Sequence, residues 1–385
     1  MKFLFASDSF KGSLSSAQTA ELLDRAAHEV FGPEGCETDR VPMADGGEGT
    51  VDAVLSAVPE NSARIAVDVR GPLPCSAVHA FYGKTGSAKA VIEMAAASGL
   101  PLVPEQLRNP LLTTTFGTGE LIRDAMERGL SDIYIAIGGS ATNDGGTGAM
   151  RALGIRFLDA EGKELTGTGA DLEKIAHIDM DGMDRRIAGG KYRFTVMSDV
   201  TNPLCGRNGA TRTFGPQKGA TPEMLDRLEE GMCHYREVIR QECGTDPGEI
   251  PGSGAAGGLG AALQVFLHAE MRSGIETVLD LVGFDDRLDG TDLVITGEGR
   301  TDSQSCCGKV MQGVGEHAAA KGVPAIGLCG SLGEGSEKIL QHGICALLTT
   351  VNAPMTLDEA LSRAGELYYN AALQFFRILK TANRL

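Results

Sequence analysis

The chain of 385 residues lacks a basic block, a long apolar run and any regularly spaced group of cysteines. Its 51 acidic residues outnumber its 35 basic ones, so the formal net charge is −16. This charge disfavours nucleic acid and anionic membrane surfaces as partners. No apolar run reaches the ~18 residues that a membrane-spanning helix needs, and residues 1–6 are too short an apolar segment for a secretory signal. We expect a cytoplasmic protein, monomeric or a small homo-oligomer, with no membrane or nucleic-acid partner.

Nine cysteines are scattered along the chain, and only Cys306 and Cys307 are close together. Adjacent cysteines rarely form a disulfide, and the spacings typical of zinc ligands are absent from the sequence. We therefore expect reduced thiols. The seven histidines lie away from the acidic and glycine-rich motifs, which disfavours a histidine-dependent triad or a histidine metal site.

Two nucleotide-binding signatures are missing or out of place. The phosphate-loop pattern G-x-x-x-x-G-K-[ST] does not occur, which disfavours a P-loop enzyme. A G-x-G-x-x-G pattern does occur at residues 252–257, but the polar segment 246–251 precedes it, where a dinucleotide site needs a strand. An NAD-dependent dehydrogenase that uses this loop stays an alternative.

Apolar runs alternate with helical patterns at both ends of the chain, and together these ends contain five predicted strands. This rhythm is typical of an α/β, flavodoxin-like doubly wound sheet. The middle of the chain alternates with a period of two near residues 74–95 and 153–178, which predicts antiparallel segments. We therefore predict a discontinuous flavodoxin-like domain (residues 1–73 plus 285–385), an inserted second α/β domain of α+β type (residues 74–284), and an active site in the cleft between them.

Glycines, carboxylates and cations gather where predicted strands end. The segment 138–148 holds the densest glycine cluster and follows the apolar run 133–137. Backbone N–H groups at such strand ends favour anions, and glycine lets the backbone approach them closely. Carboxylates for Mg²⁺ together with cations for phosphates form the set of groups that phosphoryl transfer needs. The carboxylates are Asp8, Asp45, Asp144, Asp199 and Asp302, and the cations are Lys11, Lys218, Arg300 and Lys309.

These motifs make the chain resemble the bacterial glycerate kinases of the class that includes the glycerate 2-kinases, over essentially its whole length. The resemblance implies ATP- and Mg²⁺-dependent phosphorylation of D-glycerate to 2-phosphoglycerate. Phosphorylation to 3-phosphoglycerate and a kinase of another small hydroxy acid stay as alternatives, as does a non-catalytic sensor of a small carboxylate. The resemblance rests on residues 7–11, 44–50, 93–100, 108–110, 117–120, 138–148, 199, 214–220, 254–260 and 297–302.

We hypothesise that Asp199 or Asp45 orients or deprotonates the reacting hydroxyl and that Lys11 neutralises charge on the transferred phosphoryl group. Asp8 and Asp302 are the candidates for holding Mg²⁺ or its waters. The sequence leaves open which loops bind ATP and which bind glycerate. The candidates for binding substrate or phosphate are Ser9, Gly46, Gly47, Gly138, Gly139, Ser140, Thr142, Asn143, Lys218 and Arg300.

Overall fold

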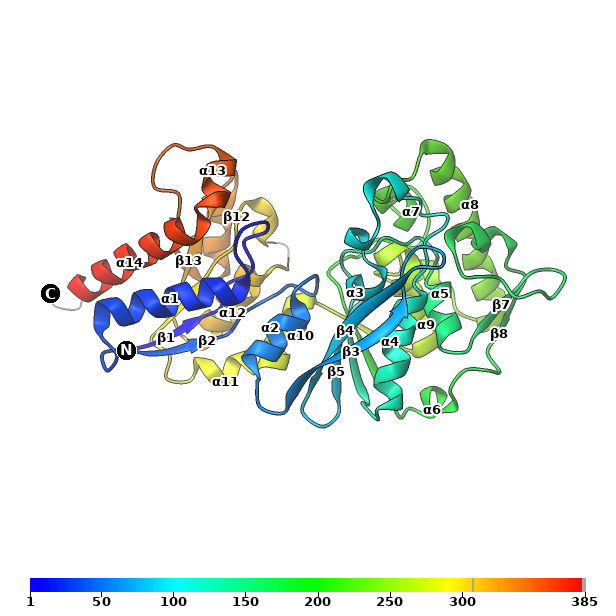
Figure 1. Cartoon of the computed structure of the whole chain (residues 1–385), viewed down its shortest axis with the longest axis horizontal. Helices are drawn as coiled ribbons and strands as arrows, with labels where there is room; N and C mark the ends of the chain where they lie inside the picture. Colours follow the sequence, from blue (N-terminus) through cyan, green and yellow to red (C-terminus); the bar gives the residue numbers. More distant parts are fainter. Residues whose placement is uncertain (307, 383–385) are drawn as a thin grey trace. The chain divides into compact units, whose positions relative to one another are not determined.

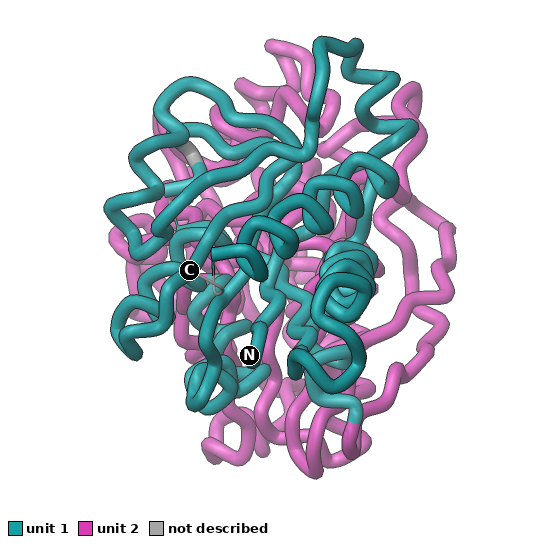
Figure 2. The backbone as a smooth tube through the Cα atoms, turned by 90° about the vertical axis from the view of Figure 1, so that its left-hand side faces the viewer, with its two compact units in different colours: residues 1–45, 52–59, 274–385 teal, residues 46–51, 60–273 magenta. Residues whose placement is uncertain are grey.

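The computed structural model describes residues 1–306 and 308–382. The chain forms two compact units (Figure 2), one of residues 1–45, 52–59 and 274–385, the other of residues 46–51 and 60–273. These units divide at 59/60 and 273/274, whereas the domain boundaries predicted from the sequence are 73/74 and 284/285. Residues 62–70 belong to the second unit because they form β3 (Ser62–Arg70), which pairs along its whole length with β4 (Ala77–Thr85).

The first unit is built on a five-stranded parallel sheet with the strand order β15-β13-β11-β1-β2. Both faces of this sheet are covered, and the central strands are accordingly mostly apolar, with Lys2 and Thr296 as the polar residues at strand ends. The strands are β1 (Lys2–Phe5), β2 (Glu37–Arg40), β11 (Leu293–Thr296), β13 (Ala325–Cys329) and β15 (Ile344–Thr349). A short parallel pair, β12 (Arg300–Thr301) and β14 (Ser331–Leu332), lies outside the sheet.

Alternation along the strands sends side chains to helices on opposite faces. Phe3 and Phe5 join one core with α1 and α14, which pack side by side (Figure 1). Leu4 and Val294 are fully buried on the other face, where α12 packs on β11 and β13. The helices are α1 (Ser16–Phe31), α2 (Thr50–Ala57), α10 (Gly274–Val282), α11 (Phe284–Leu288), α12 (Val310–Ala320), α13 (Leu357–Ser362) and α14 (Ala364–Ala382).

The second unit contains a mixed six-stranded sheet with the order β10-β9-β6-β5-β4-β3. Its parallel strands are β5 (Lys89–Glu93), β6 (Asp132–Ala136), β9 (Arg193–Met197) and β10 (Glu270–Arg272), and β3 and β4 extend it antiparallel. A separate antiparallel pair is formed by β7 (Arg156–Leu158) and β8 (His177–Asp179). The helices are α3 (Ala95–Ser98), α4 (Phe116–Glu127), α5 (Thr147–Ala152), α6 (Arg185–Ala188), α7 (Ala210–Phe214), α8 (Pro222–Cys243) and α9 (Leu259–Leu267).

Three further expectations can be compared with the structure. The eight cysteines in the described part of the chain are free thiols, and Cys307 lies outside it. Among the described helices, none combines the length and the apolar character that crossing a membrane demands. The glycine loop at 252–257 follows a 3₁₀ turn (Pro247–Glu249), and within residues 1–306 no strand leads into it, so the NAD-binding arrangement is not formed there.

Candidate active site

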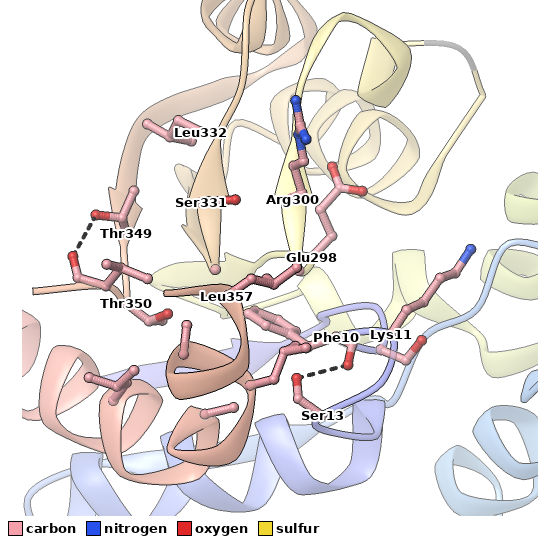
Figure 3. Close-up of a pocket in the computed structure, with 18 of the residues that line it drawn as sticks. Phe10, Lys11, Ser13, Glu298, Arg300, Ser331, Leu332, Thr349, Thr350 and Leu357 are labelled. Atoms are coloured by element: carbon pink, nitrogen blue, oxygen red, sulfur yellow. Dashed lines mark hydrogen bonds between the residues drawn. The ribbon is translucent and has the colours of Figure 1, made fainter. Parts of the chain in front are cut away.

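A cavity of about 800 Å³ opens at the carboxyl ends of the parallel strands of the first unit (Figure 3). Loops after all five strands of the sheet contribute to its lining, as expected for a ligand site in an open α/β sheet. Its polar lining includes Asp8, Ser9, Lys11, Ser13, Asp45, Glu298, Arg300, Lys309, Ser331, Thr349 and Thr350. The cavity thus collects five residues proposed from the sequence, namely Asp8, Ser9, Lys11, Asp45 and Arg300.

The loop after β1 is a tight turn that presents Lys11. The Phe10 N–H donates to the Leu14 carbonyl at 2.8 Å, and the Ser13 hydroxyl donates to the Phe10 carbonyl at 3.0 Å. Phe10 is buried edge-on against Tyr368, with ring centroids 5.2 Å apart. Because Phe10 anchors the turn, the exposed Lys11 side chain at its tip is held at the cavity.

Asp8 is a carboxylate whose ionisation is disfavoured in the folded chain. Burial is the main cause, and the nearby charge of Asp45 adds to it, so the pKa of Asp8 rises to about 7. The Ser9 N–H, which donates to Asp8 Oδ1 at 2.6 Å, and the positive charge of Lys11 oppose this rise. A cation placed near Asp8 and Asp45 would relieve both the burial and the repulsion.

Glu298 lies in the loop after β11 and is 9% exposed. Burial raises its pKa, while the Ser305 hydroxyl and Lys309 favour the charged form. Its Oε1 atom is buried and has no hydrogen-bond partner within the described residues. The flanking glycines let this loop pass close to its neighbours, since a Cβ on Gly297 would lie 2.0 Å from the Leu328 carbonyl oxygen. The close approach fixes Glu298 at the cavity.

One side of the cavity is apolar, a feature that was not predicted from the sequence. Val351, Met355 and Leu361 line it together with Leu332 and Leu357, of which Leu357 is 72% exposed. Leu357 and Leu361 are four residues apart and lie on one face of α13, whose N-terminus is capped by Thr356. Two leucines four residues apart, directly after a helix-capping threonine, are the sequence signal that could have indicated this wall.

In the second unit the glycine-rich loop after β6 has an exposed front and a buried remainder. Gly138 and Gly139 are exposed and Ser140 is partly buried, whereas residues 141–150 are all buried. Gly138 lies against Gly47, since a Cβ on it would be 3.1 Å from the Gly47 Cα. Thr142 and Asn143 lie in the buried part, and Asn143 Nδ2 donates to the Thr211 hydroxyl at 3.0 Å.

Asp144 holds this loop together from the inside. It accepts hydrogen bonds from the backbone N–H and the hydroxyl of Thr115 at 2.7 and 2.8 Å, and from the N–H groups of Gly146 and Gly148. Burial raises its pKa, and these donors oppose the rise. A Cβ on Gly146, whose φ is +75°, would also lie 2.5 Å from Ala262 Cβ. Much of the glycine content therefore serves packing.

Lys218 also contacts the loop from within. Its side chain is 2% exposed, and its Nζ donates to the Thr142 carbonyl at 2.7 Å. Burial lowers its pKa to about 7, and the nearby Asp144 opposes this. Lys218 is thus a buried donor that supports the loop backbone. Asp199 is exposed just after β9, the parallel neighbour of β6, so it follows its strand at the same sheet edge as the glycine-rich loop.

Comparison with known proteins assigns the family. The model of the glycerate kinase family matches residues 3–380. The chain is 47% identical to the glycerate 2-kinase of Escherichia coli, with 94% of each chain covered, and 45% identical to the glycerate kinase of Bacillus subtilis, with 100% of this chain and 99% of the relative covered. This chain belongs to the glycerate kinase family. The resemblance predicted from the motifs is thereby confirmed, and the chain is a kinase.

A solved structure in the glycerate kinase family agrees with this assignment. The crystal structure described as glycerate kinase 2 from Salmonella typhimurium LT2 superposes with a TM-score of 0.88 at 44% identity, and each chain is covered completely. The α/β class predicted from the sequence is confirmed by this match. The dehydrogenase and sensor alternatives do not agree with membership of a kinase family.

The lining of the cavity differs from the set of site residues proposed from the sequence. Glu298 and the hydroxyls of Ser331, Thr349 and Thr350 line the cavity, yet none of these was among the proposed site residues. Lys309, which the sequence placed among the cations but not among the binding candidates, lines the cavity as well. Asp302 is not among the lining residues and lies 3.5 Å from Arg300 as an ion pair. A glutamate between two glycines, directly after an apolar strand, is the sequence signal that points to Glu298.

Proposed function

We propose that this chain transfers the γ-phosphoryl group of ATP to the 2-hydroxyl of D-glycerate, giving 2-phosphoglycerate and ADP. The cavity of the first unit carries the proposal, because carboxylates, cations and an apolar wall meet there at the ends of parallel strands. The identity to a relative named glycerate 2-kinase supports the choice of hydroxyl. The alternatives are 3-phosphoglycerate as product and a different small hydroxy acid as substrate.

We assign the nucleotide to this cavity. A volume of about 800 Å³ lies within the roughly 300–1,000 Å³ of small-molecule sites. The apolar wall around Leu357 offers a face for the base, and the hydroxyls of Ser331 and Thr349 offer hydrogen bonds to the sugar (Figure 3). Lys11, Arg300 and Lys309 supply positive charge for the phosphates.

The carboxylates of the cavity fit Mg²⁺. Asp8 and Glu298 both have raised pKa values because they are buried, and Glu298 Oε1 has no partner in the part of the chain that the structure describes. Mg²⁺ binds one or two carboxylates and, when bound with ATP, neutralises charge that develops on the phosphates. We infer that Asp8 and Glu298 hold the ion. Asp302, the other carboxylate proposed from the sequence, already pairs with Arg300.

The remaining roles concern the reacting groups. Lys11, held at the tip of the turn after β1, neutralises charge on the transferred phosphoryl group. Asp45 lines the cavity and orients or deprotonates the hydroxyl, and Asp199 is the alternative base. Gly46 and Gly47 with the exposed front of the glycine loop, Gly138–Ser140, bind the carboxylate of glycerate through backbone N–H groups.

We also infer a flavodoxin-like fold for the first unit. Numbered along that unit, its strands follow the order 2-1-3-4-5, with helices on both faces. The second unit contributes two segments, residues 46–51 and 60–273, inside the sequence of the first. The first unit is therefore a discontinuous domain and the second an inserted one. A cytoplasmic location and a monomeric or small oligomeric state stay predictions.

The test is ADP release from ATP and Mg²⁺ with and without D-glycerate, followed by phosphorus NMR of the product. Glycerate-dependent release with a 2-phosphoglycerate spectrum supports the proposal, and a 3-phosphoglycerate spectrum overturns the choice of hydroxyl. Comparison of Asp45→Asn with Asp199→Asn identifies the base, because loss of a general base lowers kcat by about 10²–10⁴. A folded protein that releases no extra ADP with glycerate refutes this substrate.

A further inference from the structure

Two cysteines and a glutamate, far apart in sequence, meet on the surface of the second unit. Glu229 and Cys233 are four residues apart on α8 and so share one face of it. Cys205 lies in the loop between β9 and α7. One ligand atom from each residue, the two Sγ atoms and a carboxylate oxygen, lies within 4.8 Å of the other two.

The glutamate is already oriented toward this group. Its Oε1 atom accepts from the Gly206 N–H at 2.5 Å and from the Cys233 thiol at 3.7 Å. Its Oε2 atom is buried and finds no hydrogen-bond partner in residues 1–306 or 308–382. A buried carboxylate oxygen without a partner is costly unless a cation or donor occupies the adjacent space.

We propose that Cys205, Glu229 and Cys233 form a binding site for one thiophilic divalent ion of the Zn²⁺ type. Zn²⁺ binds thiolates at about 2.3 Å and carboxylate oxygens at about 2.0–2.2 Å in tetrahedral geometry, so its ligand atoms lie roughly 3.4–3.8 Å apart. The Cys233 Sγ and Glu229 Oε1 atoms are 3.7 Å apart, within this range, and all three ligand atoms lie within 4.8 Å of one another. Soft sulfur ligands select Zn²⁺ over Mg²⁺, which separates this site from the oxygen-lined cavity of the first unit.

The neighbouring charges permit an ion here. The Arg236 guanidinium is the nearby cation, and it is paired with Asp246 through two hydrogen bonds of 2.6 Å. Two thiolates and one carboxylate carry three negative charges, which is more than enough to neutralise the two positive charges of one divalent ion. Three protein ligands leave a fourth position for water. The ion would join the loop around Cys205 to α8.

The experiment uses the full chain, freed of metal and kept reduced with a phosphine, and titrates it with Co²⁺ as a spectroscopic substitute for Zn²⁺. We expect one equivalent to produce a thiolate-to-cobalt charge-transfer band that Zn²⁺ then abolishes. Cys233→Ser should remove the band, because it deletes one of the two thiolate ligands. Cys233 is exposed, so this replacement should not disturb the fold. Glu229→Gln should weaken binding by about tenfold or more, since one charged ligand is lost.

The matched control is Cys345→Ser, which removes an exposed thiol of the other unit and should leave the titration unchanged. Unfolding midpoints measured without metal show whether each variant is folded. Cys205→Ser is a third variant of the site, and if it does not fold, Cys233→Ser and Glu229→Gln suffice for the test. A wild-type chain without the band, or a band that survives in folded Cys233→Ser, overturns the proposal.

Discussion

The substitution Asp8→Asn tests whether the buried charge of Asp8 lowers the stability of the folded chain while the same charge is needed for activity. A pKa raised from 3.8 to about 7 disfavours the ionised form by about 4 kcal/mol, at about 1.36 kcal/mol for each step of one pH unit. Because Asp8 is only partly buried, we expect about 2–4 kcal/mol in practice. Asparagine keeps an oxygen that accepts from the Ser9 N–H and removes the charge.

The sign of the pH dependence follows from proton binding. Between about pH 4 and pH 7 the folded chain holds the Asp8 proton and the unfolded chain has lost it, so the folded state binds more protons. The free energy of unfolding therefore falls as the pH rises through this window, and the loss is complete above about pH 7. Asp8→Asn lacks this loss and should be more stable than the wild type at pH 8 and nearly equal at pH 4.5.

The assay is thermal unfolding without ATP or Mg²⁺ at both pH values. For a unit of this size, about 2–4 °C accompany each kcal/mol, so the midpoint of Asp8→Asn should rise by roughly 5–15 °C at pH 8. Glu334→Gln, which replaces an exposed carboxylate of the same unit, is the control. No gain at pH 8, or an equal gain at both pH values, would refute the reasoning. In the assay of glycerate-dependent ADP release, the same Asp8→Asn variant should lose activity.

Three other predictions test the remaining features. Leu357→Asp should raise the KM for ATP and leave the KM for glycerate unchanged. The control Leu340→Asp, at another exposed leucine of the same unit, should change neither KM. If both variants raise the KM for ATP equally, the apolar wall does not bind the nucleotide. Lys218→Met should flatten the fall in stability that the wild type shows as the pH drops from about 10 to about 7, because in this window the lysine of the unfolded chain binds a proton and the buried lysine does not. Unfolding at pH 7 and pH 9.5 measures this slope, and an unchanged slope contradicts the prediction. Asp144→Asn should lower the free energy of unfolding by about 2–4 kcal/mol, because the carboxylate accepts four hydrogen bonds inside the protein; urea unfolding measures it, and a loss below about 1 kcal/mol contradicts the internal role.

Much of the first unit could be predicted from the sequence. Buried parallel strands appear as apolar runs in the sequence. Four of the five predicted strands, at residues 3–6, 292–296, 323–329 and 344–351, match β1, β11, β13 and β15 within a few residues. The strand β3 was not predicted, although Ile65, Val67 and Val69 alternate with more polar residues as in a half-exposed strand. The helical segment at the C-terminal end is two helices, α13 and α14, that meet at Arg363, two residues before Gly365.

In the candidate site, too, some features could be predicted from the sequence and others could not. A glycine cluster after a strand predicts an anion site, but the sequence does not tell which glycines face solvent. The structure leaves Gly138 and Gly139 exposed and uses Gly146 to pack against Ala262. Lys218 looked like a phosphate ligand, and the structure buries it against a loop carbonyl.

The sequence by itself determined the family, the α/β class and the presence of carboxylates, cations and glycine loops at strand ends. These properties depend on local composition and periodicity, which can be read along a chain. Tertiary structure alone decided which of those groups share a cavity, that Glu298 and the leucines of α13 line it, and that Cys205 meets Glu229 and Cys233. Such encounters depend on the packing of segments distant in sequence, and burial sets the pKa of a side chain only after that packing exists.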